Sequence, residues 1–256
     1  MSPVLVVEEL TKRFAGITAL DRVSIQIDEG ERVGLIGPNG AGKTTFFNCM
    51  LGVLPVDDGT VELAGRDISR LRVSQRARLG IGRTFQRIEL FPDSTVRDHL
   101  FIAERVRSGR GRLWKDLVGL GRPRADELAA CDEVLELLGL RDLADEPIER
   151  LSLGQCRLVE VGRALMTQPK VLMLDEPSSG LDRAETAKLA KTLQEVQAAQ
   201  RFAILLVEHD VELVASFTTR CYALDYGRLI TEGTSKDVLA SPEVRAAYLG
   251  DMEPAQ

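Results

Sequence analysis

Short apolar runs and alternating segments dominate the first third of the chain. Residues 4–7 form an apolar run, and residues 23–27 alternate apolar and polar side chains with a period of two. A further apolar run, residues 33–36, leads into a glycine-rich segment. The pattern predicts strands at these places and at residues 60–63, and a helix over residues 43–51 after the glycines.

The middle of the chain has a different pattern. Residues 94–168 contain few strand signals, and the apolar residues Val134, Leu135, Leu137 and Leu138 recur at helical spacing. This segment is therefore predicted to be helical, as an insertion between two parts that contain strands.

The last third of the chain alternates between strand and helix patterns again. Strands are predicted at residues 171–174, 203–207, 221–224 and 228–230, and helices over 182–200, from about residue 210, and in two short stretches after Ser235. Strand–helix–strand alternation is typical of parallel sheets, so the two ends of the chain predict an α/β fold.

Composition narrows the class of protein. The chain has 256 residues, enough for one large core or two modest ones, and its hydrophobic and charged fractions are ordinary for a globular protein. The longest apolar run, residues 202–207, is far shorter than the about 20 residues of a membrane-spanning helix, so no such helix is expected. The first residues lack the pattern of a secretory signal, so none is expected. A net charge of −6 argues against a nucleic-acid binder.

Cysteine and histidine limit the metal and redox chemistry. The four cysteines show no paired spacing, which favours free thiols in a reducing compartment over disulfides or a zinc site. The chain has only two histidines, His99 and His209, so a histidine-rich metal site is excluded.

Gly37, Gly42, Lys43 and Thr44 complete a P-loop pattern between a predicted strand and a predicted helix. The glycines allow backbone N–H groups to surround phosphate oxygens, and the helix N-terminus adds positive dipole and free donors. Lys43 would reach the β- and γ-phosphates, and the Thr44 hydroxyl would bind Mg²⁺. A glycine-rich turn without ligand is the alternative, and the strand–loop–helix context favours nucleotide binding.

Asp175 and Glu176 follow four apolar residues, a pattern that predicts a buried strand ending in carboxylates. Asp175 would hold Mg²⁺ at the carboxyl end of the sheet, and Glu176 could accept a proton from an attacking water. A solvated acidic turn is the alternative, which the P-loop upstream makes the weaker one.

Residues 151–155, Leu-Ser-Leu-Gly-Gln, precede a helix whose apolar residues Leu158, Val161 and Leu165 share one face. Ser152 and Gln155 have the spacing of a capping box. Two interpretations stay open at this point: a well-capped helix, or a helix N-terminus presented to a phosphate.

Taken together, these motifs resemble the ATP-binding subunits of ABC (ATP-binding cassette) transporters. The resemblance rests on their order and spacing: the P-loop at residues 37–45, Gln86, residues 151–155, Asp175-Glu176, residues 179–182, and His209. Residues 80–86, the Arg-rich insertion around Leu113-Trp114 and the ending 229–250 are most similar to the ATPases of branched-chain amino acid importers.

The resemblance implies the ABC ATPase fold, which is α/β in class. It has a P-loop NTPase (RecA-like) parallel-sheet core, an N-terminal antiparallel β part and an inserted α-helical subdomain. The implied division of the single domain 1–256 is a nucleotide-binding core at 1–86 and 159–234, a helical signature subdomain at 87–158, and a C-terminal tail at 235–256.

The resemblance also implies residue roles. Catalysis falls to Glu176 as base, His209 on the γ-phosphate, Lys43 and Gln86, and the metal ligands are Thr44, Gln86 and Asp175. Phe14 would stack on adenine, although a place in the core is equally compatible with its position. The implied nucleotide-binding residues are Phe14, Gly37, Pro38, Asn39, Gly40, Ala41, Gly42, Lys43, Thr44, Thr45, Ser152, Gly154, Gln155 and Asp182.

The implied function is an ATP-hydrolysing subunit, using ATP and Mg²⁺, that powers import of small solutes, most specifically branched-chain amino acids. The alternatives are the ATPase of an exporter or of an importer for another solute, or a soluble ABC ATPase without a transport role. The implied partners are two membrane permease subunits, a second ATPase subunit (paralogue or self) in a head-to-tail dimer and, indirectly, an extracytoplasmic solute-binding protein. The implied location is peripheral, at the cytoplasmic face of the cell (inner) membrane.

Some positions depart from the family pattern or stay open. Leu153 stands where the family usually has glycine, which allows close approach to phosphate. Cys156 is interpreted as a small helix residue. The Arg-rich segment 105–124 is expected to be a solvated surface loop, with contact to anionic lipid head groups as the alternative. Leu90, Phe91 and Pro92 are expected to face the permease, or else to pack within the protein.

Overall fold

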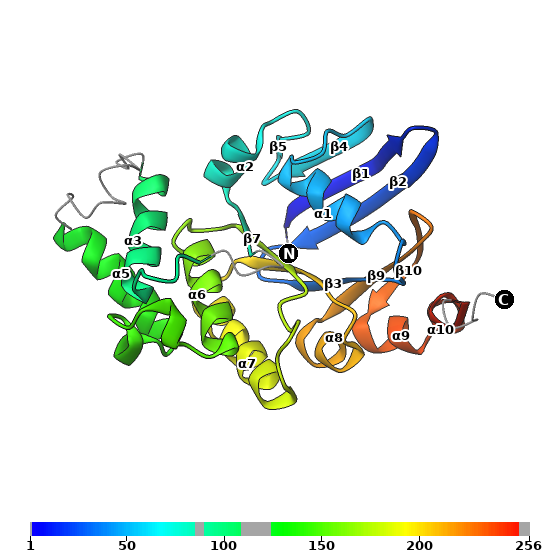
Figure 1. Cartoon of the computed structure of the whole chain (residues 1–256). Coiled ribbons are helices and arrows are strands. Elements are labelled where there is room, and N and C mark those ends of the chain that lie inside the picture. The colour runs from blue at the N-terminus through cyan, green and yellow to red at the C-terminus, as the bar shows by residue number, and fades with distance from the viewer. Residues whose placement is uncertain (1, 85–89, 109–123, 251–256) are drawn as a thin grey trace.

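The computed structural model describes residues 2–84, 90–108 and 124–250. In these ranges the chain forms two sheets with helices packed around them (Figure 1). The helices between residues 96 and 165 lie at one end of the molecule, and the antiparallel sheet and the C-terminal helices lie at the other.

The N-terminal sheet is antiparallel, with strand order β2-β1-β4-β5. Its strands are β1 (Pro3–Phe14), β2 (Ile17–Asp28), β4 (Asp58–Leu63) and β5 (Arg66–Asp67). Leu5 lies opposite Ile27 on one side and Leu63 on the other, and all three are buried. The period-two alternation therefore turns one face of this sheet to the core and the other to water.

The second sheet has six strands in the order β10-β9-β3-β8-β7-β6. The strands are β3 (Arg32–Ile36), β6 (Ile81–Arg83), β7 (Val171–Asp175), β8 (Ala203–Val207), β9 (Arg220–Asp225) and β10 (Arg228–Thr234). All neighbours are parallel except β10, which pairs antiparallel with β9 at one edge.

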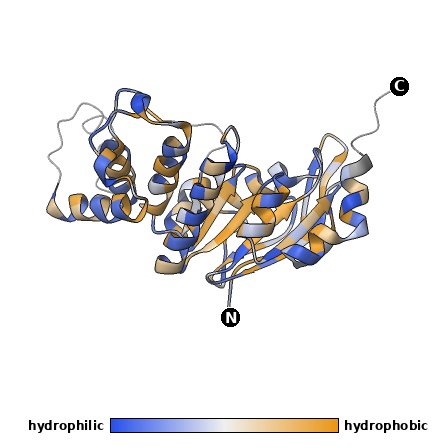
Figure 2. Ribbon diagram, turned by 90° about the horizontal axis from the view of Figure 1, so that it is seen from below, coloured by the Kyte–Doolittle hydropathy of each residue, from blue (hydrophilic) through white to orange (hydrophobic). Residues whose placement is uncertain are grey.

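Both faces of the six-stranded sheet are buried, which explains its continuous apolar runs. Leu205 and Val207 of β8 belong to the core cluster shared with the antiparallel sheet and α1 (Lys43–Leu51). Ile204 and Leu206 belong to a second cluster, formed with helices on the opposite face. Figure 2 shows the apolar strands in the interior and polar residues along the outer sides of the helices.

Helices cover the second face in two groups. The first group comprises α3 (Val96–Arg107), α5 (Ala125–Leu137), α6 (Leu153–Leu165) and α7 (Arg183–Gln200), with the short 3-10 helices η1 (Arg141–Leu143) and η2 (Ile148–Arg150). The second group packs on β9 and comprises α8 (Val211–Phe217), α9 (Ser235–Ala240) and α10 (Pro242–Gly250).

Most elements predicted from the pattern are confirmed, including the helix over residues 43–51, the strand over 171–174 and the two short C-terminal helices. β1 extends well beyond the predicted residues 4–7, because its later polar residues lie on an antiparallel sheet with a solvent face. α2 (Val73–Leu79) and β6 were not predicted. Both are short, and β6 contains a glycine, so neither shows a clear period.

The expectation of a solvated Arg-rich loop is wrong at its first residue. Arg105 lies in α3, is buried, and donates from Nε to Glu127 Oε1 at 3.3 Å. Its guanidinium also lies 3.9 Å from the ring centroid of Phe101. Arg105 therefore joins α3 to α5. Leu113, Trp114 and the rest of segment 109–123 lie outside the described residues.

The cysteines are buried free thiols, as expected. Burial raises the pKa of Cys49 to about 11 and that of Cys131 to about 12, and it also raises the pKa of Cys156. Cys156 lies buried in α6, which confirms its interpretation as a small helix residue. In the described ranges, none of the helices has the length and apolar character needed to cross a membrane.

Candidate nucleotide-binding site

Three neighbouring parallel strands, β3, β8 and β7, end side by side, and the predicted site residues lie at or just after their ends. Leu35 of β3 pairs with Val207 of β8, and Val207 pairs with Asp175 of β7. The P-loop follows β3, the His209 loop follows β8, and Glu176 follows β7. The parallel register therefore brings all three loops to the carboxyl edge of the sheet, where open α/β sheets bind ligands.

The P-loop requires glycine at specific positions. Gly37, Gly40 and Gly42 have φ angles of +151°, +78° and +103°. A Cβ at Gly37 would lie 2.2 Å from the carbonyl oxygen of Leu224, and one at Gly42 would lie 2.7 Å from that of Ala19. A side chain at either position would meet backbone as well as adopting a strained conformation, so the sequence fixes the path of this loop.

Lys43 folds back over the P-loop. Its Nζ donates to the carbonyl oxygen of Gly37 at 2.5 Å and to that of Pro38 at 2.8 Å. The ammonium group thus lies among the backbone groups that the P-loop pattern assigns to phosphate binding.

The N-terminus of α1 is built to receive an anion. Its N-cap is Gly42, which has no side chain to accept the first N–H groups, and its first turn, beginning at Lys43, contains no acidic residue. Thr44 and Thr45 lie in the same turn. The backbone N–H donors and the helix dipole both favour a negatively charged ligand at this end.

The opposite end of α1 is held by a residue that the sequence analysis did not identify. Arg76 is buried and donates to the carbonyl oxygens of Cys49 at 2.7 Å and Met50 at 2.8 Å. A cation at a helix C-terminus stabilises the helix, and here it also anchors the helix that follows the P-loop. No sequence signal identifies Arg76, because its partners are backbone carbonyls.

Asp175 lies half-buried at the end of β7. Its pKa is raised to about 6, mainly by burial and also by the negative charges of Glu176 and Glu208, against the positive charge of Lys43. A cation near this carboxyl group would stabilise its charged form. The P-loop lysine and the strand-end carboxylates therefore share one electrostatic site.

Glu208 is the functional-site residue that the sequence analysis missed. It is fully buried and accepts hydrogen bonds from Ser178 N–H at 3.0 Å and Ser178 Oγ at 2.6 Å. It also accepts from the N–H groups of His209 at 3.0 Å and Asp210 at 3.4 Å. Glu208 thereby links the loop after β7 to the loop after β8. A carboxylate directly after five apolar residues, the signal used for Asp175, would have identified it.

His209 lies beside the two glutamates at this edge. Its Nδ1 is 3.8 Å from Glu176 Oε1 and 3.6 Å from Glu208 Oε2, and the imidazole side chain is 64% exposed. Glu176 itself has a φ of +45°, and its N–H donates to Val207 O at 2.9 Å. The structure therefore brings His209 and Glu176 together, with one face open to a ligand.

The capping box at the start of α6 is confirmed. Gln155 N–H donates to Ser152 Oγ at 3.3 Å, and Ser152 N–H donates to Gln155 Oε1 at 2.8 Å. Leu153 packs against the turn at Gly180, where an added Cβ would lie 2.9 Å from Leu153 Cδ2. This side chain thus fills space beside the 179–182 segment.

Asp182 forms a second capping box at the start of α7. Glu185 N–H donates to Asp182 Oδ1 at 2.8 Å, and Asp182 N–H donates to Glu185 Oε2 at 3.3 Å. An added Cβ at Gly154 would lie 3.3 Å from Glu185 Oε1, so the starts of α6 and α7 are neighbours.

Phe14 and Gln86 complete the set of expected site residues. Phe14 ends β1 and is 41% exposed, so a place in the core is excluded. Lys12 Nζ lies 5.3 Å from the centroid of its ring. Gln86 lies outside the described residues.

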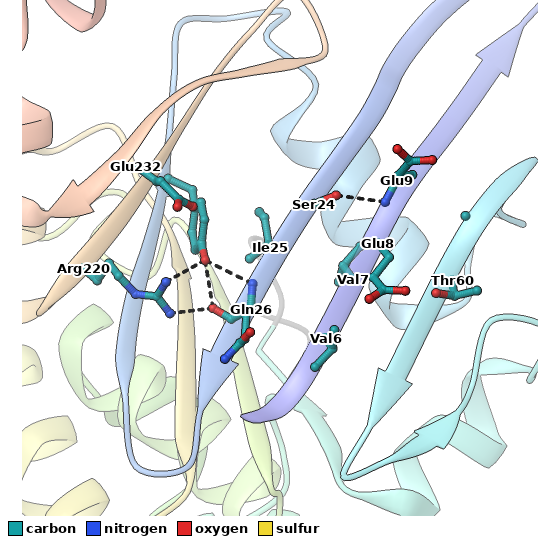
Figure 3. Close-up of a pocket in the computed structure, with 12 residues that line it drawn as sticks. Val6, Val7, Glu8, Glu9, Ser24, Ile25, Gln26, Thr60, Arg220 and Glu232 are labelled. Atoms are coloured by element: carbon teal, nitrogen blue, oxygen red, sulfur yellow. Dashed lines mark hydrogen bonds between the residues drawn. The ribbon is translucent and has the colours of Figure 1, made fainter. Parts of the chain in front are cut away.

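A polar cavity of about 750 Å³ lies between the antiparallel sheet and β9–β10 (Figure 3). The cation on its wall, Arg220, is engaged by Glu31 at 2.8 Å and by the Tyr222 hydroxyl at 2.7 Å. Glu8 and Glu232 also line it. An acidic lining repels phosphate, so this cavity is unsuited to a nucleotide.

Comparison with known proteins defines the class to which this site belongs. Residues 20–179 match the family model described as ABC transporter, and residues 228–254 match one described as branched-chain amino acid ATP-binding cassette transporter. The chain therefore belongs to the ABC transporter family and is an ATP-binding, ATP-hydrolysing cassette.

Relatives match over nearly the whole length. The chain is 38% identical over 252 residues to the high-affinity branched-chain amino acid transport ATP-binding protein LivG of Salmonella typhimurium, covering 97% of this chain and 98% of the relative. It is 36% identical over 255 residues to the corresponding protein BraF of Pseudomonas aeruginosa, with the same coverages. The recognised resemblance is confirmed.

Solved structures agree with the fold class. A crystal structure of an ABC transporter's ATP-binding cassette in its ADP conformation superposes with a TM-score of 0.87 at 32% identity, covering 98% of this chain and 100% of that one. A nucleotide-free ATP-binding cassette gives a TM-score of 0.84 at 32% identity, covering 95% and 98%. The predicted ABC ATPase fold is confirmed.

Proposed function

We propose that this chain powers the import of branched-chain amino acids through partner membrane subunits. The observation that supports the proposal is the similarity to LivG and BraF, which covers 97% of the chain and includes the C-terminal residues 228–254. If the chain were an exporter ATPase or a cassette without a transport role, its match to this C-terminal family model would be unexplained.

Nucleotide binding falls to the P-loop and its surroundings. The N–H groups of residues 37–45 and the start of α1 would surround the phosphates of ATP, and Lys43 would move from the loop carbonyls to the β- and γ-phosphates. Phe14, partly exposed beside Lys12, would stack on adenine.

Mg²⁺ fits the oxygen donors at this edge. Thr44 and Asp175 would hold it, together with Gln86 and the phosphates, and it would neutralise charge that develops during hydrolysis. Within the described ranges, no cluster of three or more His, Cys, Asp and Glu side chains could hold a metal alone. This agrees with Mg²⁺, which takes few protein ligands beside phosphate.

Glu176 is the base, and His209 positions the γ-phosphate. Glu176→Gln keeps the shape of the side chain but removes its basicity, so hydrolysis should fall by about 10²-fold or more while ATP binding persists. Phosphate release and ATP binding by the purified variant measure the two effects. Undiminished turnover would remove Glu176 from this role.

Two cassettes would form the active unit, head to tail. The start of α6 at Ser152, with Gly154 and Gln155, would approach the ATP held by the P-loop of a second subunit, a paralogue or a second copy of this chain. Asp182 would lie at the interface between them. Ser152 and Asp182 are both exposed, and the neighbouring starts of α6 and α7 could face one partner. Catalysis is then positional and electrostatic.

The permease would dock at the junction of the two halves of the molecule. Phe91 is 50% exposed, and its N–H donates to Nε2 of the buried His99 at 2.9 Å, which fixes the backbone beneath it. Ile81, Ala103 and Val106 line a largely apolar cavity of about 240 Å³ between the sheet edge and α3. Leu90 packs on the helical core, so Phe91 is the better docking residue.

The remaining features of the proposal follow from the transporter role. The cassette would sit peripherally on the cytoplasmic face of the inner membrane, with two permease subunits and an extracytoplasmic binding protein completing the system. We also propose the division into core (1–86 and 159–234), helical subdomain (87–158) and tail (235–256). The boundary at residue 158 falls within the continuous helix α6.

Uptake of radiolabelled leucine by cells that lack this protein and have no redundant importer tests the proposal. We expect uptake to be lost, restored by the wild-type chain, and not restored by Phe91→Asp, because a charge in an apolar contact costs several kcal/mol. ATPase activity of the purified Phe91→Asp chain should persist. Normal uptake in the deletion strain would contradict the assignment of branched-chain amino acids, whereas rescue by Phe91→Asp would contradict only the docking site.

A further inference from the structure

The C-terminal helix reaches the P-loop. The N–H of Gly37 donates to the hydroxyl oxygen of Tyr248 in α10 at 3.0 Å, across 211 residues of sequence. α10 is held in place by Val244, which is buried in the cluster that contains Ile36, the residue before the P-loop. The end of β3 and the tail helix are thus packed together immediately before the loop begins.

The same glycine connects this contact to the catalytic lysine. While its N–H is bound by Tyr248, its carbonyl oxygen accepts the hydrogen bond from Lys43 Nζ at 2.5 Å. Gly37 also lies against the backbone of Leu224, so it has little room to move sideways. Tyr248 therefore accepts a hydrogen bond from the same residue whose carbonyl oxygen holds Lys43 Nζ.

The rest of the loop has space on this side. A cavity of about 580 Å³ separates the outer turn of the P-loop, at Asn39 and Gly40, from Glu243 and Ala246 of α10. Tyr248 spans from the helix to the loop beside this cavity. Its hydroxyl therefore links α10 to the first residue of the P-loop.

We propose that Tyr248 is a positioning residue for nucleotide binding, which holds the first peptide of the P-loop in the conformation that receives the phosphates. The inference rests on the nucleotide site proposed above and adds a role for the tail. Through this hydrogen bond, the C-terminal segment contributes to ATP affinity without touching ATP. The hydroxyl, rather than the ring, is the active part of the side chain.

Tyr248→Phe removes only that hydroxyl and leaves the ring that packs beside Val244. We expect the dissociation constant for ATP in the presence of Mg²⁺ to rise about three- to tenfold, the range for one lost hydrogen bond. The turnover number at saturating ATP should change less than twofold, since Glu176 and Lys43 remain. Tyr226→Phe is the matched control, because Tyr226 lines the same cavity and is 85% exposed.

Equilibrium ATP titration of the full chain and the thermal midpoint without nucleotide distinguish the outcomes. A raised dissociation constant for Tyr248→Phe, with an unchanged midpoint and an unaffected control, supports positioning. An unchanged dissociation constant, equal weakening in both variants, or a lowered midpoint with normal affinity overturns it in favour of a structural role. Failure of the wild-type chain to bind ATP would instead contradict the nucleotide site.

Discussion

Two helices of this protein begin where the sequence indicates contact with phosphate, yet their N-termini differ. α1 follows Gly42, which has a left-handed conformation and no side chain that could cap the helix. α6 follows Ser152, which forms a reciprocal capping box with Gln155. One start therefore has no side-chain cap, whereas the other has a reciprocal one.

The difference indicates a division of labour. A helix start with open donors is suited to bind a nucleotide within one chain. A start with a reciprocal capping box holds its first turn in a fixed conformation. It is therefore suited to recognise a nucleotide that a second subunit has already bound.

The largest expected effect separates these two roles. Lys43→Ala removes a charged hydrogen-bond donor from the phosphate site, so the isolated chain should bind ATP at least about tenfold more weakly. Ser152→Arg leaves the P-loop intact, so the isolated chain should bind ATP normally. Both variants should lower hydrolysis by the assembled transporter by about 10²-fold or more.

A mixture of the two variants sharpens the test. Each subunit retains one intact half of a shared site, so a heterodimer should recover one working site. Phosphate release by the mixture measures this recovery. Normal hydrolysis by a transporter that carries only Ser152→Arg would contradict a site shared between subunits.

A smaller effect, on stability, is expected to distinguish the glycines at the two helix starts, Gly42 and Gly154. Gly42→Ala forces a Cβ to within 2.7 Å of a backbone carbonyl at a φ of +103°, so the free energy of unfolding should fall by about 1–3 kcal/mol or more. Gly154→Ala meets only the flexible tip of Glu185 at 3.3 Å, and alanine favours the helix by about 1 kcal/mol. Its net effect should be close to zero.

Urea unfolding of both alanine variants measures the difference. Equal loss of stability in the two would contradict the contrast between a strained loop and a regular helix start.

The smallest effect concerns the two histidines, one in each half of the molecule. Burial lowers the pKa of His99, and the positive charge of Arg163 lowers it further, against the hydrogen bond to Thr95 and the charge of Asp98. Because the folded state binds this proton less tightly than the unfolded chain, its contribution to stability is complete above about pH 6.5 and is lost as pH falls through the depressed pKa.

Thermal midpoints measured between pH 5 and pH 8 check this expectation. This range includes the reference histidine pKa of about 6.5. His99→Gln should make the thermal midpoint fall less steeply as the pH is lowered. His209→Gln should instead lower hydrolysis. If His99→Gln leaves the loss of stability at acid pH unchanged, other groups cause that loss.

Much of the site could be predicted because its motifs are local. The P-loop glycines, the capping boxes at Ser152 and Asp182, and the strand before Asp175 each depend on a few neighbouring residues. Glu208 has the same local signal as Asp175, a carboxylate after an apolar run, but Arg76 and Tyr248 have none. Their partners are backbone groups or side chains distant in sequence, such as Gly37 for Tyr248, and no period or motif encodes that contact.

The sequence by itself determined most of the strands and helices and the loops that contain the chemical groups, because periodicity and turn chemistry act within about a dozen residues. The tertiary structure alone decided which of these loops meet. The parallel register of Leu35, Val207 and Asp175 brings three distant loops to one edge. That register is set by burial on both faces of the sheet, which is a property of the whole core and of no single segment.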